Sequence, residues 1–181
     1  MQVIWYSEEE ERSEVPQQAG QYIIRREKSM VFVELAPHDE KGIEEMSAMA
    51  REIVREHFDP IIGKAQNDYM IELFQTPAAI RDQLEHGYRY FFVREDDRQI
   101  GFLAFYPRKD AMYLSKLYLY KTERGKGYSR KMLEFVIRAA VAAGLDSVEL
   151  NVNRNNSAVL AYEKLGFHVI RTEKNDIGKG F

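Results

Sequence analysis

The sequence predicts a mixed α/β (α+β) fold in which one central mixed β-sheet carries helices on both faces. From residue 30 onward, strand and helix patterns follow one another in the order β-α-α-β-β-β-α-β-α-β. The later strand–helix–strand–helix–strand part is typical of parallel pairing, whereas the hairpin before it is antiparallel. A chain of 181 residues that is 45% hydrophobic and 30% charged is long enough for one domain with its own core.

The first strand and the first helix follow from local residue patterns. Residues 30–36, MVFVELA, predict a strand that ends at Pro37. Residues 39–58 predict an amphipathic helix, because apolar residues recur at helical spacing: Ile43, Met46, Met49, Ala50, Ile53, Val54 and Phe58. The stretch DPIIGKAQ at 59–66 is expected to break this helix.

A second helical region and the rest of the sheet come next. This region begins with a helical stretch near 67–74 and leads to TPAAIRDQLEHG, where Thr76 is the expected N-cap, Pro77 the first helical residue and Gly87 the C-terminal cap. Strands are predicted at 88–95, 99–107, 111–120, 146–152 and 167–174, the first two as a hairpin around DDR. Helices are predicted at 129–144 and 156–166, each ending at a glycine.

Composition and charge exclude several classes of function. The formal net charge of −3 argues against a nucleic-acid-binding protein, which would be strongly basic. The chain has no cysteine and its four histidines show no ligand spacing, so we expect no metal. The N-terminus lacks the pattern of a signal peptide, and no apolar run approaches the ~20 residues of a membrane span. We therefore expect a soluble, cytoplasmic protein without membrane or nucleic-acid partners.

The stretch ERGKGYSRKM at 123–132 combines cationic side chains with two glycines at the mouth of a predicted helix. Glycines let the backbone approach a ligand, and the free N–H groups of a helix N-terminus bind anions. The stretch therefore predicts a phosphate or pyrophosphate site. The Walker and dinucleotide patterns both fail, because Tyr120 and Arg130 stand where glycines belong, which disfavours ATP and NAD.

Two signatures resemble those of the GCN5-related N-acetyltransferase (GNAT) superfamily. LYLYKTERGKGYSRKML resembles the acetyl-CoA-binding pattern Arg/Gln-x-x-Gly-x-Gly/Ala, with Arg124 first, Gly127 central and Ser129 in place of the last Gly or Ala. NNSAVLAYEKLGF resembles a second pattern, with matches at Asn155, Ala158, Tyr162, Gly166 and Phe167. The resemblance covers residues 112–170. It implies the acyl-CoA N-acyltransferase fold, with acetyl-CoA as cosubstrate.

The resemblance also implies roles for individual residues. The pyrophosphate would lie on the glycine turn, which consists of Arg124, Gly125, Lys126, Gly127, Tyr128, Ser129 and Arg130. Pantetheine would run between two splayed strands, 113–119 and 147–152, against Leu117, Tyr118, Leu119 and Asn155. The backbone N–H of Leu119 or Tyr118 would stabilise the oxyanion, and Tyr162 would donate a proton to the leaving thiolate. Ordinary alternatives are helix capping for Asn155 (or by Asn156 or Ser157) and aromatic packing for Tyr162.

The implied activity is transfer of the acetyl group to a primary amine by direct attack in a ternary complex. The helices at 38–87 would line the acceptor cleft, and they resemble those of bacterial polyamine acetyltransferases. The acidic residues of the first helix suit a small, polyamine-like amine, although helix solubility explains them as well. The general base stays open among Glu149, His57, Asp68, Glu72 and Tyr118. A non-catalytic acetyl-CoA-binding or sensing module and a protein lysine or N-terminal acetyltransferase are the alternative functions.

Residues 1–29 are predicted to be an N-terminal extension of a single GNAT domain at 30–181. The extension contains two strand-like pieces, QVIWY and QYIIRRE. In the superfamily that the chain resembles, a further strand usually completes the sheet beside the one predicted at 167–174. This chain shows no such strand after it. Because an uncovered strand edge is a liability, we predict that one N-terminal piece supplies the missing sheet edge, from the same chain or from the partner in a homodimer.

Overall fold

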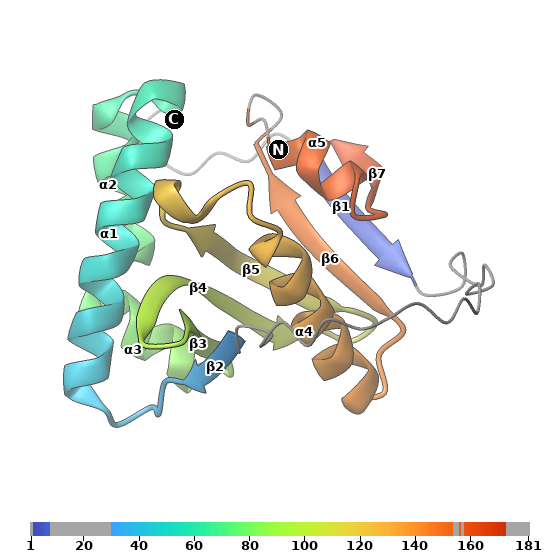
Figure 1. Cartoon of the computed structure of the whole chain (residues 1–181), viewed down its shortest axis with the longest axis horizontal. Helices are drawn as coiled ribbons and strands as arrows, with labels where there is room; N and C mark the ends of the chain where they lie inside the picture. Colours follow the sequence, from blue (N-terminus) through green and yellow to red (C-terminus); the bar gives the residue numbers. More distant parts are fainter. Residues whose placement is uncertain (1, 8–29, 154–155, 157, 173–181) are drawn as a thin grey trace, which may run out of the picture.

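The computed structural model of the chain describes residues 2–7, 30–153, 156 and 158–172. These residues form a seven-stranded mixed sheet with the strand order β2-β3-β4-β5-β6-β1-β7 (Figure 1). The elements are β1 (Gln2–Ser7), β2 (Met30–Glu34), α1 (Glu40–Ile62), α2 (Lys64–Phe74), α3 (Pro77–Glu85), β3 (Arg89–Glu95), β4 (Arg98–Pro107), β5 (Met112–Leu119), α4 (Tyr128–Ala142), β6 (Ser147–Val152), α5 (Ala158–Glu163) and β7 (His168–Thr172). Within these residues, no helix is both long and apolar enough to cross a bilayer.

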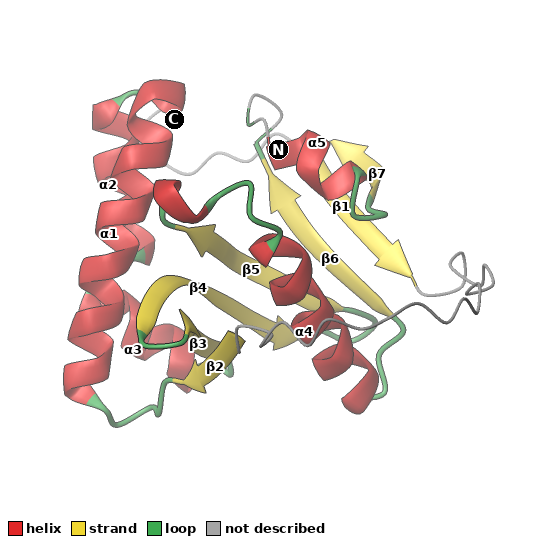
Figure 2. Ribbon diagram, in the orientation of Figure 1, coloured by secondary structure: helices red, strands yellow, loops and turns green. Residues whose placement is uncertain are grey.

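The sheet separates two hydrophobic cores, which confirms the prediction of helices on both faces (Figure 2). Successive side chains of β3 point to opposite faces. Tyr90 and Phe92 therefore join the core beneath α1 and α3, while Phe91 and Val93 join the core beneath α4. Both layers are closely filled: their largest buried side chains include Phe102 and Ile43 on one side and Phe105 and Met132 on the other.

The helix boundaries follow most of the local signals. The side chain of Thr76 accepts a hydrogen bond from the N–H of Ala79, and Pro77 begins α3, as predicted. The predicted break of the first helix within 59–66 is confirmed, although α1 continues through Pro60 to Ile62 and the break itself lies at Gly63, just before α2. Proline near a helix end removes one hydrogen bond, whereas the positive φ of Gly63, +82°, turns the chain out of the helix.

Strands β5 and β6 pair over two residues and then part. Met112 lies opposite Val148 and Tyr113 opposite Glu149. Beyond these two pairs the described residues show no further pairing between the strands, which agrees with the predicted splaying. On its other edge β5 stays paired with β4, with one irregularity at Ser115. The extra residue brings Lys116 and later side chains of β5 into a new register, so that Tyr118 faces the core beneath α1 and α3.

The N-terminal piece QVIWY forms β1 and joins the sheet, but not at its edge. β1 pairs antiparallel with β6 on one side and with β7 on the other. The expected edge strand is therefore an inner strand supplied by the same chain, and β7 is the edge. An inner position gives β1 hydrogen-bonding neighbours on both sides, whereas an edge position would give it one. The second piece, QYIIRRE, lies outside the described residues.

Candidate active site

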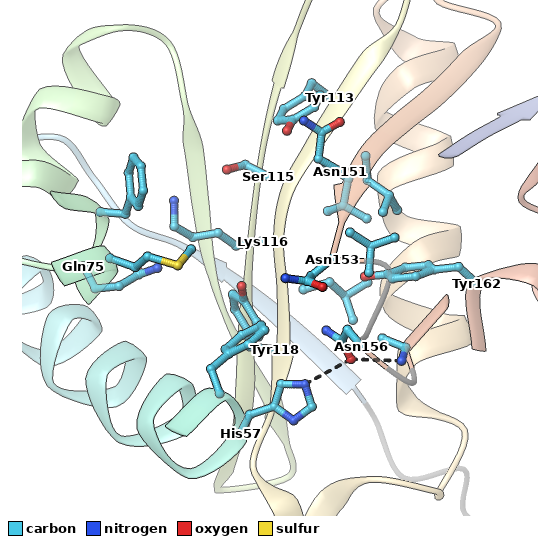
Figure 3. A pocket seen from close by; sticks show the side chains of 18 of the residues that line it. His57, Gln75, Tyr113, Ser115, Lys116, Tyr118, Asn151, Asn153, Asn156 and Tyr162 are labelled. Atoms are coloured by element: carbon cyan, nitrogen blue, oxygen red, sulfur yellow. Dashed lines mark hydrogen bonds between the residues drawn. The ribbon is translucent and has the colours of Figure 1, made fainter. Parts of the chain in front are cut away.

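A cavity of about 1070 Å³ opens between the parted ends of β5 and β6 and continues beneath α1, α2 and α3. Its walls also include the turn before α4 and one side of α5. Figure 3 shows side chains from both strands and from the helices pointing into this space. The site residues that line it among those predicted are Leu117, Tyr118, Leu119, Arg124, Gly125, Ser129 and Tyr162. Asn155 lies outside the described residues.

The glycine turn leaves the N-terminus of α4 open to a ligand. Gly125 and Gly127 have φ of +76° and +82°, a conformation that L side chains rarely adopt, and a Cβ at either would meet no atom within 4 Å. Gly127 is the N-cap of α4 and provides no side-chain cap, so the first N–H groups of the helix are left for another partner. These groups and the adjacent Arg124 fit a phosphate well.

The side chains of Lys126, Tyr128 and Arg130 in this turn lie outside the cavity. Lys126 donates to Glu123 at 3.0 Å, and Tyr128 packs its ring into the core beneath α4. Arg130 is exposed on α4. Lys126, Gly127, Tyr128 and Arg130 do not line the cavity, so any contribution from Tyr128 to an anion site comes from its backbone.

The backbone of β5 presents two residues to the open gap. The N–H of Tyr120 donates to the carbonyl of Ile100 on β4 at 3.1 Å. Because backbone groups of successive strand residues point to alternate edges, Tyr118 also faces β4, and Leu117 and Leu119 face the gap left by β6. Of the two predicted oxyanion donors, this geometry favours Leu119 over Tyr118. The carbonyl of Leu119 accepts from Arg124 Nε at 3.1 Å, which fixes the first signature residue at the mouth of the gap.

Tyr162 lines the cavity from α5. Its ring is half-buried and packs edge-on against Phe167, with the ring centroids 5.5 Å apart. Burial, with a smaller contribution from Tyr118, raises the pKa of the Tyr162 phenol well above its usual range. The hydroxyl is therefore protonated at neutral pH and can donate a proton. The packing alternative also applies, since the same ring contacts the core.

His57 and Asn156 form a bridge across the mouth of the cavity. His57 Nε2 lies 3.3 Å from Asn156 Oδ1 (Figure 3). The Nδ1 of the same ring lies 3.3 Å from a guanidinium nitrogen of Arg124. Arg124 can only donate, so Nδ1 accepts and Nε2 carries the proton of a neutral ring. Burial, followed by the charge of Arg124, lowers the pKa of His57 in agreement with this state. Asn156 Oδ1 also accepts from the N–H of Ala158, so Asn156 caps α5.

The candidates for a general base divide by location. His57 and Tyr118 line the cavity, whereas Glu149, Asp68 and Glu72 do not. Glu149 is bound to Arg108 at 2.6 Å, and Asp68 is paired with Arg55 and Lys64 on the surface. Burial raises the pKa of Tyr118 to about 12. In the described part of the chain, no three His, Asp or Glu side chains gather as a metal site.

Lys116 is a cavity residue that the sequence analysis did not select. Its side chain is 5% exposed and Nζ donates to Gln83 Oε1 at 2.6 Å. The ammonium lies 5.5 Å and 5.1 Å from the ring centroids of Tyr88 and Tyr90. Burial lowers the pKa of Lys116 to about 7. The available signal was a lysine inside the apolar strand MYLSKLYLY, where a solvated position is least expected.

The sequence matches the family described as "Acetyltransferase (GNAT) domain" over residues 49–180. The chain belongs to this family. It is 30% identical over 91 residues to the [ribosomal protein bS18]-alanine N-acetyltransferase of Haemophilus influenzae, which covers 49% of this chain and 62% of that protein. It is 35% identical over 63 residues to the GCN5-related N-acetyltransferase 6, chloroplastic, of Arabidopsis thaliana, which covers 34% of this chain and 22% of that protein. The GNAT chain thus spans less than two thirds of either curated relative.

The GNAT fold is also seen in solved structures. The PaiA N-acetyltransferase of Thermoplasma acidophilum in complex with coenzyme A superposes with a TM-score of 0.67 at 20% identity, over 80% of this chain and 93% of that one. The predicted acyl-CoA N-acyltransferase fold is therefore confirmed. Arg124, Gly125, Ser129 and Tyr162 lie around one cavity of this GNAT domain.

Proposed function

We propose that the protein is an acetyl-CoA-dependent N-acetyltransferase that acetylates a small primary amine by direct attack in a ternary complex. The observation that carries the proposal is the gap between β5 and β6. The N-terminus of α4, which has no side-chain cap, lies near this gap, and the protonated Tyr162 lines the same cavity. Membership of the GNAT family supports acetyl-CoA as the donor.

Acetyl-CoA would supply an activated acetyl group as a thioester. The N–H groups at the start of α4, with Arg124, would bind its phosphates, and Leu117 and Leu119 would offer backbone groups to its pantetheine. The Leu119 N–H would stabilise the oxyanion that forms when the neutral amine attacks the acetyl carbon. The Tyr162 hydroxyl would give its proton to the sulfur as the carbon–sulfur bond breaks, and the nitrogen would lose its extra proton to solvent, from which the Tyr162 phenol is protonated again.

The experiment that tests the proposal is a panel of acceptors with acetyl-CoA, in which free thiol release is measured. The panel contains monoamines, polyamines, amino acids and peptides with a free N-terminal alanine. Thiol release with a small amine supports the proposal, and release only with peptides supports the protein acetyltransferase alternative. Tight coenzyme binding without release for any acceptor would favour the non-catalytic binding module.

The polyamine-like acceptor gains no support from the cavity. The acidic residues of α1 that suggested it do not line the cavity, whose only carboxylate among the described residues is Asp82. Asp82 is itself largely exposed and lies 3.4 Å from His86 Nδ1. Helix solubility accounts for the acidic residues of α1.

A further inference from the structure

The acceptor side of the cavity, here called the acceptor chamber, is aromatic and carries a buried amine. It is bounded by the face of β5 opposite α4 and by α2 and α3. Its wall includes Phe74, Gln75, Tyr88, Tyr106, Tyr113 and Lys116. Three tyrosine rings lie in a row, with centroid separations of 4.2 Å from Tyr88 to Tyr106 and 5.2 Å from Tyr106 to Tyr113. Such a wall suits an apolar or aromatic ligand body.

Lys116 has no negatively charged partner among the described residues of the acceptor chamber. Arg108, which also lines the cavity, is neutralised by Glu149 at 2.6 Å. Among the described residues no carboxylate pairs with Lys116, whose side-chain partners are the neutral amide of Gln83 and the tyrosine rings. A buried ammonium without a counter-ion is costly, and an anionic ligand would remove that cost.

A second buried group in the chamber also lacks a partner. Gln75 is 6% exposed, and its Oε1 accepts no hydrogen bond from any described residue. An unpaired buried oxygen is a site for an N–H donor. Gln75, which directly follows α2, and Lys116 of β5 line the same cavity (Figure 3). The chamber thus offers an acceptor oxygen, a cation and an aromatic wall within one cavity.

We propose that the acceptor of this enzyme is an aminocarboxylate with an apolar or aromatic body, whose carboxylate binds Lys116 and whose amine N–H donates to Gln75. One buried amine matches a monoanion such as a carboxylate, whereas a phosphate dianion would bring more charge than one amine neutralises. The inference rests on the proposed N-acetyltransferase function and names its substrate class. Burial holds the Lys116 pKa at about 7, so carboxylate binding takes up a proton and weakens as pH rises above that value.

Matched acceptor pairs test the proposal. Phenylalanine, tyrosine and leucine are compared with phenethylamine, tyramine and isopentylamine, which lack only the carboxylate. We expect kcat/KM to be about tenfold or more higher for the amino acids, mainly through KM, as for a charge-assisted hydrogen bond. Lys116→Met should remove this preference, so that each amino acid and its matched amine have similar kcat/KM, and Lys116→Arg should restore part of it. Lys131→Met, on the exposed side of α4, is the control.

A dead-end ligand gives a readout that needs no turnover. Binding of 3-phenylpropionate, measured by calorimetry at pH 6 and pH 9, should be tighter at pH 6 in the wild type and weak at both values in Lys116→Met. If these variants differ as expected but no amine is acetylated, the carboxylate site stands and the proposed function fails. If amines are acetylated but carboxylates bring no advantage, or if spermidine is preferred, the function stands and the aminocarboxylate proposal is overturned.

Discussion

Replacing Gly127 by aspartate or asparagine tests the phosphate site at the start of α4. The two variants have nearly the same size and both tolerate the left-handed conformation of this position, at a cost of about 1 kcal/mol relative to glycine. A Cβ here would meet no atom within 4 Å, so neither variant clashes with the protein. Both side chains are also favoured helix N-caps, so both proteins should fold.

The difference between the two variants is one negative charge. A carboxylate about 6 Å from a phosphate is repelled by roughly 1–3 kcal/mol, for an effective dielectric constant between about 20 and 80. Each 1.4 kcal/mol changes the dissociation constant tenfold. We therefore expect Gly127→Asp to bind coenzyme A about tenfold more weakly than Gly127→Asn, and the difference to shrink in 0.5 M NaCl because salt screens exposed charges.

Titration calorimetry with coenzyme A at two salt concentrations measures this difference directly. Circular dichroism melts show whether both variants are folded. Equal dissociation constants for two folded variants would refute the reasoning, because they would mean that the phosphates do not bind at the N-terminus of α4.

Three further predictions follow from the site and the sheet. Tyr162→Phe should lower turnover about 100-fold, as expected for loss of a general acid, and leave the dissociation constant for acetyl-CoA near wild type; unchanged turnover with chemistry rate-limiting would return Tyr162 to a packing role. Deleting residues 1–7 removes β1 from between β6 and β7 and should lower the melting temperature by more than about 4 °C, and an unchanged melt would contradict the inner position of β1. Because the folded-state pKa of His57 is lowered, its contribution to stability is present above pH ~6.5 and is lost as pH falls below it. The melting temperature of His57→Gln should therefore fall less between pH 8 and pH 5.5 than that of the wild type, and parallel falls would rule out this linkage.

Local chemistry explains what the sequence predicted well. The N-cap at Thr76 and the start of α3 at Pro77 depend on neighbouring residues, and both lie where the pattern puts them. The parting of β5 and β6 was expected from the family resemblance rather than from any residue pattern in the strands themselves.

Tertiary contacts explain what the sequence did not predict. The break predicted at 59–66 could not be assigned to one residue from the sequence: α1 continues through Pro60 to Ile62, and the chain leaves the helix at Gly63. Lys116 would ordinarily be solvated, and only the folded sheet and α3 bury it against Gln83. The partners of β1 lie far along the chain, and no local pattern distinguishes an edge strand from an inner one.

The position of β1 also has a consequence for the order in which the chain folds. Gln2 lies opposite Val152 on one side and Thr172 on the other, so β1 is synthesised well before the two strands with which it pairs. At about 5–20 residues per second, this strand waits roughly 10–30 s on the ribosome before β7 emerges. The antiparallel strands β2 to β5 have closer partners and can form first. We expect closure of the sheet around β1 to be the late and slow step, and the interval before it to be the time when the nascent protein most needs protection from aggregation.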